Sequence, residues 1–476
     1  MAATTPPEST FYPIVNDDLF NEHCIRANEA WQKKMLTASN IRSLEALVSC
    51  EMGNRRPVEF VTTAKGSYNL VLKFRIRDGA TPTHVALRVP QRGYSPSALV
   101  SEKLENEVHW MQYFEEMRIA PVPHVYSWRS EQSSGGMDPY ILMDFVEGEN
   151  LNACWTDWEA STSEADKAKQ RTAVQQLAAI LLELSRPRFD KIGSITKAAD
   201  GSWVVTQRPL TYDMYVHLSG IPDFPTDAWP AGPLQSTQEY KAFVAHLRRQ
   251  QMMCLRNINL PGTWDTEGFF DFQTGKHIDM ERAIATASGR VLSRRAMDLP
   301  DYAAHLNGDI GPFAIFCPDL SRFDILADPA TGKITALLDL EFTNTMPAAF
   351  AQDPPLWHAT YDLARCIERG LLSIWQERYS PNLDAFLAAL EEVEAEHGEA
   401  LPLLSTRMRE SWDRGIYLIN CALHHSEMTD ILYHELPTMF PVLDPSVVTE
   451  ELKTYQEHTM HQIAAYDKER VSLLKE

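Results

Sequence analysis

The residues best suited to chemistry lie in one stretch of the chain, positions 313–342, with the sequence FAIFCPDLSRFDILADPATGKITALLDLEF. Two short apolar runs flank a turn at 328–332 that contains proline and glycine, which is typical of an antiparallel hairpin. Asp324 enters the first strand and Asp339 leaves the second, and a hairpin brings its two open ends together. Asp319 lies five residues before Asp324. The spacing therefore predicts three carboxylates at the mouth of one hairpin.

Three carboxylates in one place are costly, because like charges a few ångströms apart raise one another's pKa. A divalent cation removes that cost. Mg²⁺ takes hard oxygen ligands, commonly one or two carboxylates together with substrate phosphates and waters. The cluster therefore predicts a site for a metal-bound nucleotide, in which the remaining carboxylate serves as the base.

The spacing Asp319-x-x-x-x-Asp324, followed by a hairpin and Asp339-x-Glu341, resembles the catalytic and metal loops of the protein-kinase-like superfamily. It looks most like the aminoglycoside phosphotransferase branch, whose loops run H-x-D-x-x-x-x-N-I-L and then I-D-x-E, and in particular its fungal members, the phosphotransferase enzyme family proteins. The resemblance extends over residues 58–147 and 313–365, with a shorter similar stretch at 192–194.

The resemblance assigns a role to each carboxylate of the hairpin. Asp319 stands where the family has its catalytic aspartate, Asp324 where it has a metal-binding asparagine, and Asp339 where it has the principal Mg²⁺ ligand. Two interpretations of Glu341 stay open: it assists the metal from outside its ligand shell, or it is a surface or structural carboxylate.

An earlier part of the chain supplies the nucleotide-binding residues that the resemblance implies. The sequence Val-Ala-Leu-Arg at 85–88 resembles the V-A-I-K strand, in which Ala86 roofs the adenine and Arg88 holds the α- and β-phosphates. Glu107 is the expected ion-pair partner of Arg88, with Glu105 as the alternative. Ser67 belongs to a predicted phosphate-covering loop, Lys-Gly-Ser-Tyr-Asn at 65–69.

The adenine itself is expected between a hinge and a floor. After the strand that begins at Tyr140, backbone groups from Asp144 to Val146 would read the adenine edge, and Leu326 would lie beneath the ring. These assignments, like those of Ser67 and Ala86, rest on the resemblance.

Three residues depart from the family pattern. Cys317 replaces a histidine that braces the catalytic loop, and Arg88 replaces a lysine, exchanging a compact ammonium for a planar fork. Asp324 replaces asparagine, so it adds a negative charge beside the phosphates and should raise the metal dependence or shift the metal preference. Asp362 either braces the catalytic loop or only caps a helix.

The predicted fold class is α+β: a bilobal protein-kinase-like fold with a small antiparallel-sheet N-lobe and a larger, mainly helical C-lobe. Residues 1–57 are expected to form an N-terminal arm and helices, 58–147 the nucleotide-binding N-lobe with turns at 78–79 and 133–136, and 148–476 the helical C-lobe carrying the hairpin. A helix is predicted near 163–186, with Ser161 and Glu164 as a capping box.

Composition excludes several classes of partner and compartment. The 476 residues include 65 acidic and 44 basic side chains, a net charge of −21, which repels nucleic acid and anionic membranes and is compatible with a cationic substrate. No run of eighteen apolar residues predicts a membrane span. Seven scattered cysteines without a C-x-x-C pair predict free thiols. The first twenty residues contain no Lys or Arg and no apolar run, which argues against secretory and mitochondrial presequences and predicts a cytoplasmic location.

The sequence as a whole predicts an ATP- and Mg²⁺-dependent phosphotransferase that acts on a hydroxyl of a small molecule. The alternative is a kinase-like nucleotide-binding or scaffold protein that has lost catalysis, as the departures at Cys317 and Asp324 would allow. The dinucleotide, Walker and nucleophile-elbow motifs G-x-G-x-x-G, G-x-x-x-x-G-K-[ST] and G-x-S-x-G do not occur. No motif identifies the acceptor or the oligomeric state.

Overall fold

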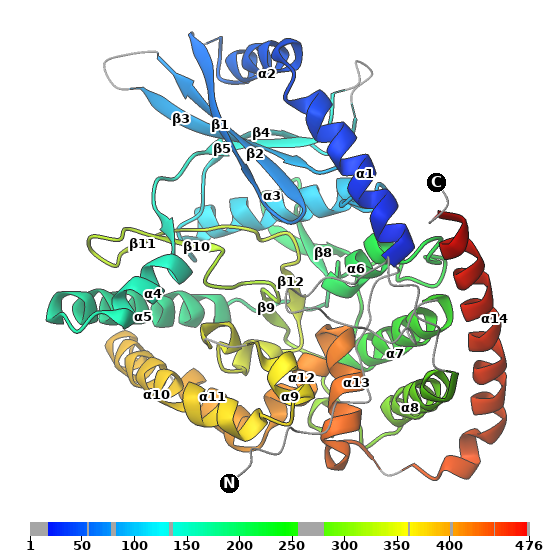
Figure 1. The fold of residues 1–476 in the computed structure, drawn as a ribbon. Helices are drawn as coiled ribbons and strands as arrows, with labels where there is room; N and C mark the ends of the chain where they lie inside the picture. The colour runs from blue at the N-terminus through cyan, green and yellow to red at the C-terminus, as the bar shows by residue number, and fades with distance from the viewer. Residues whose placement is uncertain are drawn as a thin grey trace.

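The computed structural model describes residues 18–54, 57–77, 82–132, 137–255, 280–359, 362–399, 403–441 and 443–473. The predicted N-terminal arm and the turns at 78–79 and 133–136 lie outside these residues. Figure 1 shows an upper lobe built on a sheet and a larger lower lobe built mostly of helices.

The upper lobe contains a five-stranded antiparallel sheet in the order β1-β2-β3-β5-β4. Its strands are β1 (Val58–Lys65), β2 (Asn69–Ile76), β3 (Thr83–Pro90), β4 (Val125–Arg129) and β5 (Tyr140–Asp144). The lobe's helices are α1 (Asp18–Met35), α2 (Ala38–Glu51) and α3 (Val100–Met117).

Side chains alternate between the two faces of this sheet, as the period of a strand requires. On β2, Leu72 and Phe74 point to the far face, where they pack against Trp31 of α1 and Val48 of α2 in a buried cluster. On β3, Ala86 belongs instead to the large core that continues into the lower lobe. The two N-terminal helices thus seal the far face of the sheet, and its other face is left for the cleft between the lobes.

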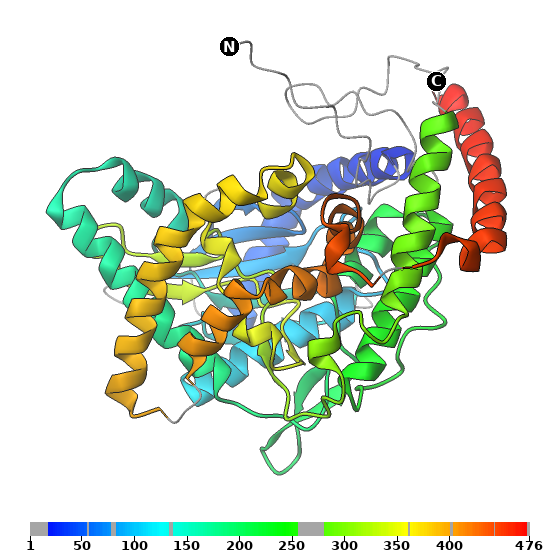
Figure 2. The same cartoon turned by 90° about the horizontal axis from the view of Figure 1, so that it is seen from below.

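The lower lobe is a set of helices packed around short strands. Helix α5 runs beside α10, and α14 lies along α7 and α8 (Figure 2). The helices are α4 (Leu151–Ala160), α5 (Glu164–Ser185), α6 (Tyr212–Gly220), α7 (Thr237–Cys254), α8 (Met280–Met297), α9 (Leu363–Glu368), α10 (Leu372–His397), α11 (Leu404–Asp413), α12 (Ile416–His424), α13 (Ser426–Glu435) and α14 (Thr449–Leu473).

Short strands carry the predicted hairpin. Strands β10 (Ile325–Ala327) and β11 (Ile334–Leu337) pair antiparallel, and β6 (Glu149–Asn150) adds to β10. Strands β9 (Ala314–Phe316) and β12 (Asn344–Met346) form a second pair, and β7 (Ser194–Lys197) and β8 (Trp203–Gln207) a third.

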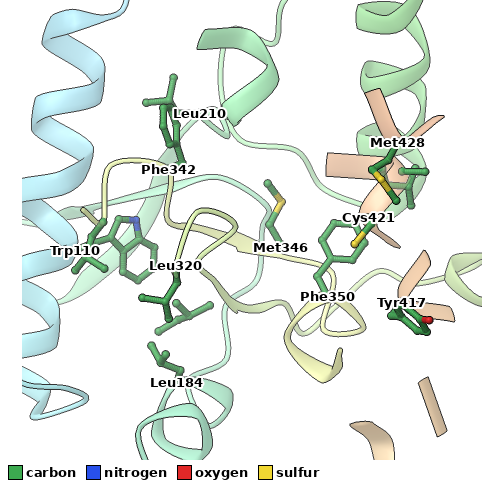
Figure 3. Packing of buried hydrophobic residues seen from close by; sticks show 14 of the residues in the cluster. Trp110, Leu184, Leu210, Leu320, Phe342, Met346, Phe350, Tyr417, Cys421 and Met428 are labelled. Atoms are coloured by element: carbon green, nitrogen blue, oxygen red, sulfur yellow. The ribbon is translucent and has the colours of Figure 1, made fainter. Parts of the chain in front are cut away.

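One continuous apolar core supports these strands from beneath. Figure 3 shows Trp110 of α3, Leu184 of α5, Met346 of β12, Cys421 of α12 and Met428 of α13 in this core, all buried. The same core therefore reaches from the upper lobe past the hairpin of β10 and β11 to the C-terminal helices.

The tip of the hairpin is seated on α5. Gly332 has φ +73°, and a Cβ added there would lie 2.4 Å from the carbonyl oxygen of Lys169, so only glycine fits. The Gln176 side chain accepts a hydrogen bond from the Ile334 N–H at 3.1 Å. The position of the turn is thus set by α5.

The predicted helix at 163–186 is present, but its cap differs from the prediction. The side chain of Ser163, not Ser161, accepts the hydrogen bond of the first turn, from the Ala165 N–H. Ser161 instead accepts from the N–H of Ser163, so both hydroxyls serve the helix start. Within the described residues, no helix combines the length and apolar composition needed to cross a bilayer.

Packing of α1 and α2 on the sheet should be a main source of stability for the upper lobe. Replacing the fully buried Leu72 by alanine is expected to cost about 2–5 kcal/mol in the free energy of unfolding, measured by urea denaturation, through lost burial and a residual cavity. Leu36→Ala, at a leucine that is 43% exposed, should stay within about 0.5 kcal/mol of the unmodified protein. Equal losses in the two variants would contradict the assigned packing.

Candidate active site

A cavity of about 620 Å³ lies between the two lobes, and the predicted carboxylates line it. Asp319, Asp324 and Asp339 approach it from the lower lobe, and Arg88 and Glu107 from the upper one. The three aspartates thus lie in one crevice, as the hairpin geometry predicted, and Arg88 and Glu107 line it with them.

The hairpin sets the positions of Asp324 and Asp339. Ile325 pairs with Leu337, and the N–H of Leu338 donates to the Asp324 carbonyl at 2.7 Å, so the two aspartates leave the paired strands at the same end. Asp339 has φ +60°, a left-handed conformation that is uncommon outside glycine. Such strain is concentrated at functional sites, and here it turns the Asp339 carboxylate toward Arg88.

Arg88 is the central cation of the site. Its guanidinium donates to Glu107, to Asp339 Oδ1 at 2.5 Å and to Glu341 Oε2 at 3.0 Å. The structure therefore pairs Arg88 with Glu107; Glu105, the alternative, accepts from Ser130 instead. A planar fork with five donors can serve three carboxylates, which a lysine ammonium does less well.

Glu341 is neither at the surface nor beside the solvent. It is fully buried, and its Oε2 also meets Lys103 Nζ at 3.0 Å and the side-chain amide of Asn69 at 3.2 Å. Asn106 donates to the Glu341 carbonyl oxygen at 3.0 Å. Glu341 is thus a structural partner of two cations, and these contacts connect both lobes.

Sequence reasoning missed Lys103, which is buried on α3 one turn before Glu107. Its ammonium lies 4.5 Å from the centre of the Tyr215 ring and 5.4 Å from that of Tyr68, besides its ion pair with Glu341. Burial lowers the pKa of Lys103, and the nearby Glu341 carboxylate opposes that shift. The helical spacing of Lys103 and Glu107 was the available signal.

The carboxylates titrate differently because their surroundings differ. Burial, together with the charges of Asp339 and Asp324, raises the pKa of Asp319 well above its usual range. Burial also raises the pKa of Asp324 to about 6, although Ser321 donates both its hydroxyl, at 2.5 Å, and its N–H, at 3.0 Å, to that carboxylate. Arg88 lowers the pKa of Asp339 against the opposing effect of burial. Asp319 is thus the group prepared to hold a proton.

The donor set fits Mg²⁺ accompanied by phosphates. Asp324 and Asp339 supply hard carboxylate oxygens, and burial, with the charge of Asp339 adding to it, raises the pKa of Asp324, a shift that a bound cation would oppose. Among the described residues, no group of three or more acidic, His or Cys side chains is close enough to hold a metal alone. Two carboxylates completed by substrate phosphates and waters is the usual Mg²⁺ arrangement in such sites.

The predicted phosphate loop lies over the cavity. Ser67 lines it, and the loop is closed by a hydrogen bond from the Gly66 N–H to the Asn69 carbonyl at 2.9 Å. The buried Gln91, which sequence reasoning missed, donates from its side-chain amide to the carbonyls of Gly66 and Asn69. Tyr68 turns down toward the lower lobe, where its phenol lies 3.4 Å from that of Tyr212.

The predicted adenine contacts are only partly in place. Met143 lines the cavity, but Ala86, Asp144, Val146 and Leu326 do not. In place of Leu326, which lies on the central strand of its sheet, Leu337 and Leu338 line the cavity.

In the predicted hinge, the Asp144 side chain and two backbone N–H groups form hydrogen bonds within the upper lobe. The Asp144 carboxylate accepts from the Tyr126 hydroxyl at 2.6 Å, and its N–H donates to the carbonyl of His124. The N–H of Phe145 donates to the His84 carbonyl. In the described part of the chain no hydrogen bond uses the N–H of Val146, and its contact with the adenine edge stays a prediction.

Two further residues have clear positions. Cys317, in the place of the family histidine, accepts a weak hydrogen bond from the Thr343 hydroxyl at 3.4 Å, and burial raises its pKa to about 11, so it braces the loop as a neutral thiol. Asp362 caps α9 by accepting from the Arg365 N–H at 2.8 Å. The helix-cap interpretation of Asp362 is the one that the contacts support.

Fold and site together define a two-lobed protein with the protein-kinase-like fold. Residues 50–281 match the sequence model of the Phosphotransferase enzyme family, which confirms the resemblance predicted from the motifs. The matched residues contain the five-stranded sheet and α3 of the upper lobe and end before the hairpin of β10 and β11, so the resemblance of the hairpin is separate from that match.

Curated relatives match parts of the chain at low identity. A protein of Debaryomyces hansenii named "Altered inheritance of mitochondria protein 9, mitochondrial" is 21% identical over 310 residues, 61% of this chain and 48% of that protein. A subtelomeric hrmA-associated cluster protein of Aspergillus fumigatus is 26% identical over 153 residues, 32% of this chain and 27% of that protein. The chain thus spans about half, or less, of the length of these relatives.

Solved structures with similar chain paths include two phosphotransferases. Plasmodium vivax ethanolamine kinase is 14% identical with a TM-score of 0.34, covering 86% of this chain and 82% of its own. An aminoglycoside phosphotransferase of Streptomyces rimosus is 17% identical with a TM-score of 0.32, covering 81% of this chain and 98% of its own.

The relatives correct one expectation from the sequence. The prediction of a cytoplasmic location is wrong, because relatives from Debaryomyces hansenii, Scheffersomyces stipitis and Clavispora lusitaniae are all named as mitochondrial proteins. That prediction rested on the absence of Lys, Arg and an apolar run from the first twenty residues and on the lack of a predicted membrane span.

The raised pKa of Asp324 predicts that removing its charge increases the free energy of unfolding, and that the increase depends on pH. A carboxylate whose pKa rises from 3.8 unfolded to about 6 folded destabilises the protein above pH 6, and the loss disappears as pH falls toward 4. In metal-free buffer at pH 7.5, Asp324→Asn should therefore raise the unfolding free energy by about 1–2 kcal/mol after solvent screening, and less at pH 5.

Asp328→Asn, at the turn of the same hairpin, is the matched control for that measurement. Its carboxylate accepts from the N–H of Ala330 at 2.8 Å, and this bond lowers its pKa, so no gain is expected at pH 7.5. A gain in Asp324→Asn that grows toward low pH would contradict the sign of the shift.

Lys103 should stabilise the folded protein through its ion pair with Glu341. Lys103→Met leaves the buried Glu341 with fewer donors and is expected to cost about 1–3 kcal/mol in urea denaturation. Adding Glu341→Gln should recover part of that loss, because the two side chains interact directly. Lys34→Met, at an exposed lysine, is the control. Strictly additive losses in the double variant would argue against the pairing.

Proposed function

We propose that the protein is an ATP- and Mg²⁺-dependent phosphotransferase that acts on a hydroxyl group of a small molecule. The observation that carries the proposal is the cavity in which Arg88 of the upper lobe pairs with Asp339, with Asp319 and Asp324 on the same wall. Phosphoryl transfer chiefly requires positioning and charge neutralisation, and these residues supply both.

Each residue has a distinct part in the proposed reaction. Asp324 and Asp339 would hold Mg²⁺, which neutralises phosphate charge when bound. Arg88, braced by Glu107 and Glu341, would then exchange its contact with Asp339 for the α- and β-phosphates. Asp319 would orient the acceptor hydroxyl and take its proton, and its raised pKa suits a group that must accept one.

A non-catalytic role in nucleotide binding or as a scaffold is the second candidate. The specific observation in its favour is the direct 2.5 Å contact between Arg88 and Asp339, which occupies both groups. It is supported as well by Asp324, whose charge repels phosphate in the absence of a metal.

Thermal unfolding with ATP, with Mg²⁺ and with both will test the nucleotide site. Both candidate functions predict that the pair raises the midpoint more than either alone, because ATP brings the remaining metal ligands. Asp339→Ala should lose this response, and Asp157→Ala, at an exposed aspartate, should keep it. The absence of any response to ATP with Mg²⁺ would refute both.

Turnover separates the two candidates. For a phosphotransferase, slow Mg²⁺-dependent ATP hydrolysis should fall at least about a hundredfold in Asp319→Asn, while the thermal response to ATP with Mg²⁺ persists. Hydrolysis that is unchanged in this variant, or absent from the unmodified protein, would favour the non-catalytic role.

A further inference from the structure

A second cavity, of about 400 Å³, adjoins the first on the other side of the phosphate loop. Ser67, Tyr68 and Tyr212 line both cavities. Tyr94 and Val216 line only the second one, which lies between the loop and helix α6. The two spaces therefore meet at a wall of shared side chains.

Tyr212 connects the second cavity to the catalytic carboxylate. Its ring packs edge-on against Phe342, with ring centres 5.5 Å apart, and its hydroxyl lies 3.4 Å from that of Tyr68. Asp319 lines the first cavity together with Tyr68 and Tyr212, and burial, with the charge of Asp319 adding to it, raises the pKa of both phenols. The tyrosines that separate the two cavities thus line the first cavity together with the group that would take the acceptor's proton.

The wall of the second cavity is rich in tyrosine and carries one charge. Tyr68, Tyr94 and Tyr212 present rings and hydroxyls, and Lys65 is the one charged side chain that the described residues contribute to the lining. The Lys65 ammonium lies 5.6 Å from the centre of the Tyr94 ring. Among the described residues no carboxylate lines this cavity.

This wall suits one class of acceptor and disfavours another. Aromatic rings prefer offset or edge-on ring partners, and a tyrosine hydroxyl can orient a polar group at the same time. A cation entering the cavity would meet the ammonium of Lys65 beside the Tyr94 ring, without a carboxylate of the lining to pair with it. An anionic substituent would instead find Lys65 as its partner.

We propose that the second cavity is the acceptor site and takes an aromatic alcohol that carries no positive charge, with an anionic group preferred beside Lys65. This inference rests on the proposed phosphotransferase function and narrows its substrate. In the reaction the acceptor hydroxyl oxygen forms a bond to the γ-phosphorus of ATP, the bond to the bridging oxygen breaks, and ADP leaves. Asp319 takes the hydroxyl proton, so the products are a phosphate monoester, ADP and a proton.

Three alcohols of nearly equal shape test the charge preference. They are 4-(hydroxymethyl)benzoate, 1,4-benzenedimethanol and 4-(aminomethyl)benzyl alcohol, which are anionic, neutral and cationic at pH 7.5; kanamycin is added as a polycation. Phosphate-ester formation by the full chain with ATP and Mg²⁺ should follow the order anionic, neutral, cationic. A preference for the amine or for kanamycin overturns the inference, as does transfer to none of the four while ATP is still hydrolysed.

Blocking the second cavity tests whether the acceptor binds there. Val216→Trp fills it without touching the first cavity, so basal ATP hydrolysis should persist while ester formation falls about a hundredfold, the cost of displacing a reacting group by about 1 Å. Val204→Trp, at a valine that is 37% exposed on β8, should change neither rate. Unchanged ester formation in Val216→Trp overturns the inference and leaves the phosphotransferase function standing.

The role of Lys65 is tested by a ratio, because this side chain also lines the first cavity. Lys65→Gln should lower kcat/KM for 4-(hydroxymethyl)benzoate relative to 1,4-benzenedimethanol by roughly two- to fivefold, the value of one exposed ion pair. Any effect of the substitution on the use of ATP is common to both acceptors, so it cancels in the ratio of their kcat/KM values. A ratio equal to that of the unmodified protein would overturn the assigned preference for an anionic group.

Discussion

The structure depends on balancing negative charge at the contact between the lobes. Glu107 and Glu341 are buried there, Asp339 stands beside them, and the described cations that meet these carboxylates directly are Arg88 and Lys103. Buried ion pairs are favourable only when geometry and hydrogen bonds are good, and an unpaired buried charge is far more costly than the pair. The lobes are therefore held in register by groups that cannot separate without exposing one another's charge.

The need to balance buried negative charge accounts for two departures from the family pattern together. An arginine in place of lysine brings a fork that meets Glu107, Asp339 and Glu341 at once, as the site's extra acidity requires. Asp324 adds to that acidity and is itself held by Ser321. With Lys103 as the second cation, the site tolerates carboxylates that a single lysine would not balance.

Much of this arrangement could be predicted from the sequence, for identifiable reasons. A turn with proline and glycine between apolar runs fixed which aspartates share a hairpin mouth, and alternation identified the strand of Arg88. Lys103, Gln91 and the tyrosines could not be found this way, because a lysine on a charged helix or a tyrosine in a loop looks like surface until tertiary packing buries it. Leu326 does not line the cavity, whereas Leu337 at the end of β11 and Leu338 just after it do.

The seating of Gly332 against the backbone of α5 has a mechanical consequence. The hairpin is clamped at its tip by contact with Lys169 and at its mouth by the bond from Leu338 to Asp324, and a close-packed interior leaves little slack between the two points. Helix α5 lies along α10 in the lower lobe. A displacement of α5 would therefore move the hairpin as a rigid unit. It would shift Asp324 and Asp339 at the other end of the hairpin.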